Sequence, residues 1–174
     1  SLKLDENDLS SCSLYRTALK YDPQNVTTKA FLLESLITTA QFAEAEKLKK
    51  ELDAIKIEDG NALRALSNYS LAIEDYDATN AYLERAEKLK NDPLRYITLR
   101  LMAQCRIRQG IEANVADLFR QAAQAAESPY EQELHYGSAA LASSKGADAE
   151  EHFRRASHML PDDIAWQSGL AQAL

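Results

Sequence analysis

The sequence predicts an all-α fold, a solenoid in which antiparallel helical hairpins repeat along the chain. Alanine is abundant, at 28 of the 174 residues, and alanine is the strongest helix former. Turn formers are scarce, with 5 glycines and 4 prolines. The prolines and several small residues also recur at an interval of about 34 residues, and a period of this length is typical of helical repeat proteins.

The period is visible in the prolines and in four columns of residues. Pro23 and Pro161 are 138 residues apart, which corresponds to four steps of 34.5. Three columns of mostly small residues keep the step: Ala18, Leu52, Ala86, Ala122 and Ala156; Ala45, Thr79, Val115 and Ala149; Leu33, Ser67, Ala103, Gly137 and Ala171. A fourth column is bulky, with Lys49 as its exception: Tyr15, Leu83, Phe119 and Phe153. In every column one interval is 36 residues instead of 34. This predicts a two-residue insertion in the turn at 88–93.

Each repeat unit divides into two helices, because apolar residues follow helical spacing on both sides of a short break. The predicted helices cover residues 9–21, 26–40, 42–55, 61–73, 76–89, 94–109, 112–126, 130–144, 147–160 and 164–174. Breaks within units are expected at Gly110 and Lys145–Gly146, and proline marks the returns between units. The predicted divisions are 1–25 (second helix of a truncated repeat), 26–59, 60–95 (with the insertion), 96–129, 130–163, and 164–174 (first helix of a truncated repeat).

Several motifs recur at matching places in these units. They are Ala149-x-x-x-Phe153-x-x-Ala156-x-x-x-x-Pro161, Tyr15-x-x-Ala18-x-x-x-x-Pro23, Tyr136-Gly137, Phe42-Ala43-Glu44-Ala45 and Asp75-Tyr76. Through them the chain resembles the tetratricopeptide repeat (TPR) family from about Leu9 to Leu174. The resemblance implies a right-handed α-solenoid of about four and a half repeats. Leu33, Lys49 and the insertion depart from the family pattern.

The two ends of the array fall in the middle of repeats, whereas solenoids normally finish in polar capping helices. Apolar residues are expected to be uncapped at both ends: Leu9, Leu14 and Ala18, then Ile164, Trp166, Leu170 and Leu174. We therefore expect either a piece excised from a longer protein or a homo-oligomer formed through these ends.

The motifs of several enzyme classes are missing from the sequence. It has no glycine-rich phosphate loop, no Gly-x-Ser-x-Gly and no His-Glu-x-x-His, so no catalysis, cofactor or metal is predicted. Glu131 and His135 are four residues apart, and we interpret them as a helix-surface pair.

The charge and the composition limit the classes of partner and the cellular compartments that fit the sequence. A net charge of −7 argues against broad nucleic-acid binding, which needs a basic face, and no apolar run approaches the roughly 18–20 residues that span a bilayer. Cys12 and Cys105 are expected to be small buried residues rather than a disulfide. Unpaired cysteines favour a cytoplasmic location, with the periplasm as the alternative, and the alanine- and glutamine-rich composition favours a bacterial source.

The family resemblance implies that the first helix of each hairpin lines an inner groove. The candidate peptide-binding residues are Arg64, Asn68, Leu71, Arg100, Gln104, Ile107, Arg108, Leu134, Ser138 and Leu141. Arginine presents a planar fork that suits carboxylates, so three arginines in one groove predict a partner with an acidic segment. The alternative is that acidic neighbours such as Glu34 and Glu131 pair with these arginines within the chain.

The function predicted from the sequence is a non-catalytic scaffold or adaptor that binds a protein, peptide or helical segment in this groove. Two alternatives stay open. One is an assembly factor of a bacterial secretion, pilus or envelope machine that acts mainly by self-association. The other is an accessory array fused to an enzyme outside this segment.

Overall fold

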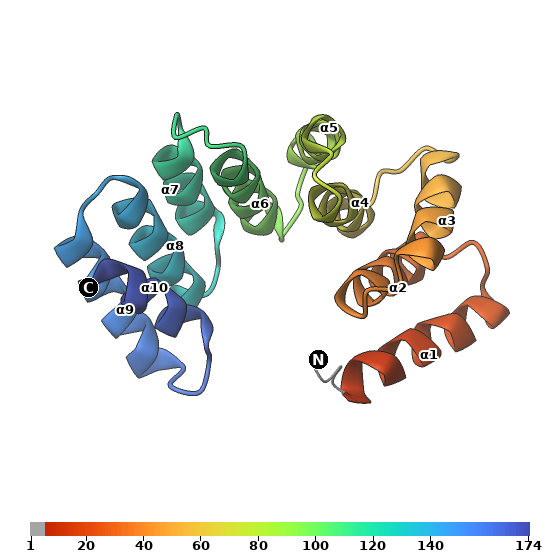
Figure 1. The fold of residues 1–174 in the computed structure, drawn as a ribbon, viewed down its shortest axis with the longest axis horizontal. Coiled ribbons are helices and arrows are strands. Elements are labelled where there is room, and N and C mark those ends of the chain that lie inside the picture. Colours follow the sequence, from red (N-terminus) through yellow and green to blue (C-terminus); the bar gives the residue numbers. More distant parts are fainter. Residues whose placement is uncertain (1–5) are drawn as a thin grey trace. The chain divides into compact units, whose positions relative to one another are not determined.

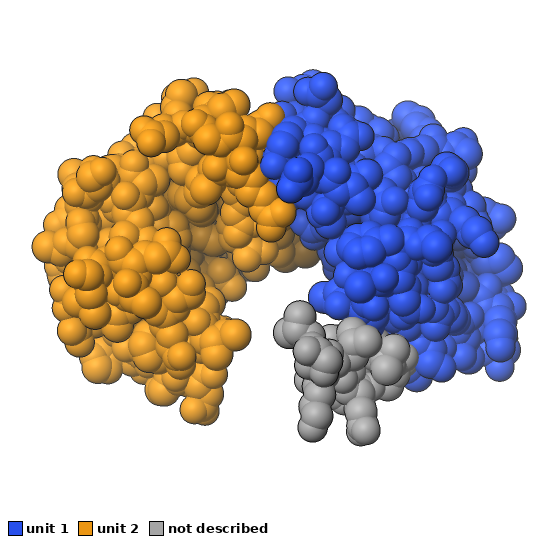
Figure 2. All heavy atoms as spheres, in the orientation of Figure 1, with its two compact units in different colours: residues 1–90 blue, residues 91–174 orange. Residues whose placement is uncertain are grey.

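The computed structural model describes the backbone of residues 6–174 and the side chains of residues 11–174. This part of the chain contains ten α-helices and no strand, which confirms the predicted all-α fold (Figure 1). The helices are α1 (Glu6–Tyr21), α2 (Val26–Thr38), α3 (Phe42–Asp53), α4 (Gly60–Ala72), α5 (Tyr76–Glu87), α6 (Arg95–Arg108), α7 (Val115–Ala125), α8 (Pro129–Ala142), α9 (Gly146–Met159) and α10 (Ala165–Ala173). They form two compact units, unit 1 over residues 1–90 and unit 2 over residues 91–174 (Figure 2).

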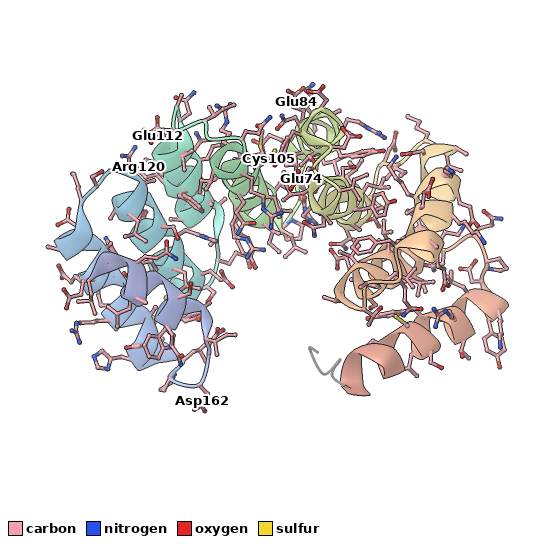
Figure 3. All side chains as sticks on the ribbon, in the orientation of Figure 1. Glu74, Glu84, Cys105, Glu112, Arg120 and Asp162 are labelled. Carbon is pink, nitrogen blue, oxygen red and sulfur yellow. The ribbon has the colours of Figure 1, made fainter. Side chains whose placement is uncertain are left out.

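The first helix of each helical hairpin ends at one residue in the left-handed conformation, and the α6–α7 turn has a second such residue, Asn114, just before α7. The residues that end the first helices are Ala40, Glu74, Gly110 and Ser144, with φ between 56° and 71°; Glu74 is labelled in Figure 3. They are 34, 36 and 34 residues apart, so the turns repeat the period and the two-residue lengthening that the sequence shows. The repeat boundaries themselves stay a prediction.

A pair of backbone hydrogen bonds closes each of these turns. The left-handed residue donates its N–H to the carbonyl three positions back, at 2.9–3.2 Å. The residue after it donates to the carbonyl five positions back at 2.8–2.9 Å: Gln41 to Leu36, Asp75 to Ser70, Ile111 to Arg106, and Lys145 to Ala140. This is the Schellman closure of a helix end, in which a left-handed residue is required. The predicted breaks at Gly110 and near Lys145–Gly146 both fall in these turns, with Ser144 as the left-handed residue of the second and Gly146 as the first residue of α9.

Unit 1 is a stack in which α1 packs on α2, α2 packs on α3 and α4, and α4 packs on α5. Its core consists mainly of fully buried leucines: Leu33, Leu36, Leu52, Leu63, Leu66 and Leu83. Asn25 is the N-cap of α2 and Asp59 is the N-cap of α4. In each case the side-chain oxygen accepts a hydrogen bond from the backbone N–H three residues later, at 2.8 and 2.9 Å. The first helices of the two hairpins in unit 1 are therefore capped in the same way, whereas α6 and α8 have no side-chain cap within the described part of the chain.

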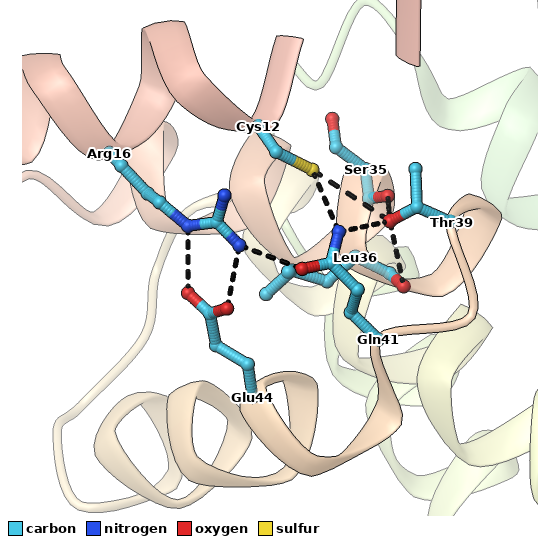
Figure 4. Close-up of polar contacts among 7 residues, drawn as sticks. All are labelled: Cys12, Arg16, Ser35, Leu36, Thr39, Gln41 and Glu44. Carbon is cyan, nitrogen blue, oxygen red and sulfur yellow. Dashed lines mark hydrogen bonds and ion pairs between the residues drawn. The ribbon is translucent and has the colours of Figure 1, made fainter. Parts of the chain in front are cut away.

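Helix α1 is attached to the α2–α3 hairpin by a polar cluster around Arg16 (Figure 4). The guanidinium donates to both carboxylate oxygens of Glu44, at 3.0 and 2.6 Å, and to Oε1 of Gln41 at 2.9 Å. Gln41 in turn donates to the Thr39 hydroxyl at 2.8 Å, and the buried Cys12 thiol lies 3.8 Å from the same hydroxyl. The hydrogen bonds from Arg16 lower the pKa of Glu44, as expected for a bidentate ion pair.

In unit 2, α6 packs on α7, α7 on α8, α8 on α9, and α9 on α10. Phe153 on α9 is 2% exposed and has glycines on two neighbouring helices against its ring. A Cβ atom would come within 2.7 Å of the ring at Gly137 and within 2.3 Å at Gly169, so only glycine fits at either position. The small-residue column that contains Gly137 continues to Ala171 in the last helix, but Ala171 is exposed and it is Gly169 of α10 that lies against the ring.

The cysteine prediction is confirmed, since Cys12 and Cys105 are both fully buried and form no disulfide with each other. Of the apolar residues expected to be uncapped, Leu14, Ile164 and Leu174 are exposed, and the side chain of Leu9 lies outside the described residues. Two others are partly covered by the chain itself: the Trp166 indole donates to the Leu160 carbonyl at 3.1 Å, and Leu170 packs near Phe153. Association through these residues stays a prediction. None of the helices described here has the length and apolar character needed to cross a membrane.

Candidate functional site: the groove of unit 2

Unit 2 contains a groove of about 910 Å³, which we call the unit 2 groove. Helical spacing places its lining residues on one face of each helix. The lining comes from α6 (Arg100, Gln104, Ile107), α8 (Tyr130, Glu131, Leu134, His135, Ser138, Leu141), α10 (Ala165, Ser168, Gly169, Gln172), and Val115, Phe119 and Phe153 on α7 and α9. Asp163, in the turn before α10, and Glu112, in the turn before α7, also line it.

Six of the ten predicted binding residues therefore lie together in this groove: Arg100, Gln104, Ile107, Leu134, Ser138 and Leu141. Arg108 is exposed and is not among the lining residues. The reason is geometric. Each residue turns a helix by about 100°, so a residue eight positions beyond Arg100 points about 80° away from it.

Two buried polar atoms in the groove, Nε of Arg100 and Nε2 of His135, have no hydrogen-bond partner within the described part of the chain. His135 is 3% exposed. Tyr130 is 7% exposed, and its hydroxyl interacts with the Asp163 side chain. Because almost all buried polar groups in folded proteins are hydrogen-bonded, two exceptions in one groove mark a place where a ligand could supply the missing partners.

The charges at this end of the groove influence one another. Burial raises the pKa of Glu131, with Asp163 adding to the rise and Arg100 opposing it. Burial, followed by the Arg100 charge, lowers the pKa of His135 to about 4, and burial with the Asp163 carboxylate raises the pKa of Tyr130 to about 12. At neutral pH the imidazole and the phenol are therefore uncharged, and Arg100 acts on Glu131 and His135.

The interpretation of Glu131 and His135 as a surface pair is wrong. His135 Nε2 does lie 3.6 Å from a Glu131 oxygen, but the imidazole is buried. Its ring lies against Tyr96 of α6, with the ring centroids 5.8 Å apart. Residue spacing along α8 could not reveal that His135 is buried, because Tyr96, which lies against it, belongs to α6.

The buried imidazole predicts a specific loss of stability in acid. The folded-state pKa of His135 is about 4 against an ordinary value of 6.5, so the unfolded chain binds the proton more tightly. The contribution of His135 is fully present above pH 6.5 and is lost as the pH falls towards 4, by an amount on the order of 3 kcal/mol. In urea unfolding, the stability of wild type relative to that of His135→Gln should fall by about 3 kcal/mol between pH 6.5 and pH 4. A difference that stays constant across this range would contradict the assignment.

The other three predicted residues, Arg64, Asn68 and Leu71, lie on α4 in unit 1. Arg64 is only 4% exposed, and its guanidinium donates to Oδ1 of Asn61 at 2.9 Å. Burial raises the pKa of Glu34, and the hydrogen bond that Asn68 donates to it at 3.4 Å and the charge of Arg64 oppose the rise. The alternative in which acidic neighbours pair with the arginines stays a prediction. The convergence of Arg64 and Arg100 on one ligand stays a prediction.

Sequence reasoning missed several lining residues: Tyr130, Asp163, Ser168 and Gln172. For α10 a signal was available, because Ser168 and Gln172 are four residues apart and repeat the spacing of polar residues on the earlier first helices. For Asp163 there was none, since it stands in a turn whose path depends on how α10 packs.

Solved structures resemble this chain, although no family model and no curated protein matches its sequence. A thermophilic TPR protein from Thermus thermophilus matches with a TM-score of 0.77 and 17% identity, over 93% of this chain and 88% of that one. A tetratricopeptide repeat protein from Parabacteroides merdae matches with a TM-score of 0.73 and 14% identity, over 96% of this chain and 64% of that one. The structure of MamA matches with a TM-score of 0.60 and 17% identity, over 84% of this chain and 85% of that one.

These likenesses define the class of protein by its architecture, a helical repeat protein built from paired helices. The chain has the TPR fold, and the resemblance predicted from its motifs is confirmed at the level of the fold.

Proposed function

We propose that this protein is a non-catalytic interaction scaffold that holds a peptide or helical segment of a partner protein in the unit 2 groove. The observation that carries the proposal is a groove of about 910 Å³ in which buried nitrogen atoms of Arg100 and His135 lack hydrogen-bond partners within the described residues. A segment of polypeptide could supply both the missing donors and the missing acceptors.

The remainder of the lining suits the side chains of such a segment. Ile107, Leu134 and Leu141 contribute apolar surface, and Phe119 of α7 and Phe153 of α9 add to it. Polypeptide ligands typically combine apolar anchors with a few placed polar contacts. The groove is carried by packed helices rather than loops, so little ordering is needed when a segment binds.

The groove hydroxyls give no support to a catalytic role. Ser138 donates its hydroxyl to the Leu134 carbonyl at 2.9 Å, and the Ser168 hydroxyl lies 3.4 Å from the Gln172 amide. Neither contact is to a general base, which an activated nucleophile requires beside it. The proposal is therefore binding without chemistry.

An acidic partner segment stays a prediction. Within the unit 2 groove it would depend on Arg100, and the carboxylates of Glu131 and Asp163 line the same space.

The test is to select a random-peptide phage library on the protein and to measure dissociation constants for the enriched peptides. Ser138→Trp should fill the groove and weaken binding by at least about tenfold, the effect expected at a well-packed contact. Gln121→Trp is the matched control, because Gln121 is exposed on α7 and is not a lining residue. If no peptide is enriched, or if both variants bind as well as wild type, the groove is not the binding site.

A further inference from the structure

Two carboxylates share one end of the unit 2 groove. Glu131 lies in the first turn of α8 and Asp163 in the turn before α10, and they are close enough for Asp163 to affect the ionisation of Glu131. Among the described lining residues the basic side chains are Arg100 and His135, and His135 is uncharged at neutral pH. Two carboxyl groups at this end of the groove therefore have Arg100 as the one charged basic side chain among the described lining residues, and Glu112 adds a third carboxyl group at the other end.

Two buried side chains beside these carboxylates can accept hydrogen bonds, and Nε2 of one of them, His135, has no partner within the described residues. Tyr130 and His135 are both more than nine-tenths buried, and both line the groove. The phenol oxygen accepts, and a neutral imidazole accepts at the ring nitrogen that carries no proton. A ligand group that offers several donors and one positive charge would satisfy these acceptors and the two carboxyl groups together.

Apolar surface continues from this polar end of the groove. Leu134 is one turn along α8 from Glu131, and Leu141 is two turns further on the same face. A long aliphatic stem that ends in a cation matches such a surface, because lysine and arginine bury their methylene groups while the charged head reaches a polar site.

We propose that the unit 2 groove receives a lysine or arginine side chain of the bound segment, with its cationic head between Glu131 and Asp163. This inference rests on the proposed function and specifies the chemistry of the partner. It is the opposite of an acidic partner, which would bring a further carboxyl group to an end of the groove that already holds two.

The peptide selection described above provides the experiment. We expect the enriched peptides to share a basic residue, and its replacement by norleucine, which keeps the stem and removes the charge, should weaken binding about tenfold. Glu131→Gln should weaken binding of the basic peptide by a similar factor and leave the norleucine peptide nearly unchanged. Glu84→Gln is the matched control, since Glu84 is exposed on α5 in unit 1 (Figure 3).

The outcomes of this experiment separate the two proposals. Peptides that are sensitive to Ser138→Trp but share an acidic residue, or have no basic one, would uphold the groove and overturn the cation site. Equal effects of Glu131→Gln on the basic and norleucine peptides would also overturn it, because a structural disturbance would not distinguish the two. A selection without enriched peptides would overturn the proposed function and this inference with it.

Discussion

Replacing Phe153 by alanine should lower the free energy of unfolding by about 3–5 kcal/mol, the usual cost of removing a fully packed aromatic ring. The ring belongs to α9 and lies against glycines of α8 and α10, so three helices lose a shared contact at once. Gly137 and Gly169 have no side chains that could move into the cavity. Relaxation should therefore be small and the loss near the upper part of the range.

Urea unfolding followed by circular dichroism measures this loss, with Phe42→Ala as the control. Phe42 is 40% exposed at the start of α3, so the same change of residue type should cost far less there. Hydrogen exchange should also show faster opening of α8, α9 and α10 in Phe153→Ala. Equal losses in the two variants would mean that Phe153 does not join these helices.

Ala122→Leu should destabilise the protein by about 1–3 kcal/mol through overpacking. Ala122 on α7 is fully buried in a cluster with Leu99 and Ala103 of α6 and Ala139 of α8. The added carbons have no space between three packed helices and must displace a neighbour.

The control for this second change is Gln121→Leu, one residue earlier on the same helix and exposed. It introduces the same side chain without crowding, so its melting temperature should stay near that of wild type. A wild-type melting temperature in Ala122→Leu would show that the small-residue column does not mark close helix packing.

The sequence was sufficient for the hairpins because their requirements are local and repeated. Ala122 and Ala156 are fully buried, as a column of small residues predicts for close helix crossings. The groove was only partly predictable. Spacing along α6 places Arg100, Gln104 and Ile107 on one face, but the burial of His135 and the position of Asp163 depend on contacts with other helices.

The left-handed turn residues have a consequence for how firmly each hairpin is closed. An L-residue with a Cβ atom is strained in this conformation by about 1–2 kcal/mol, and Ala40, Glu74 and Ser144 all carry one. Gly110 does not, and it closes the hairpin that carries Arg100 on its first helix. The α6–α7 turn instead has a left-handed residue with a Cβ atom at its other end, Asn114, just before α7. Each hairpin turn therefore contains one such strained residue, placed where the first helix ends in three of them and where the second helix begins in the fourth.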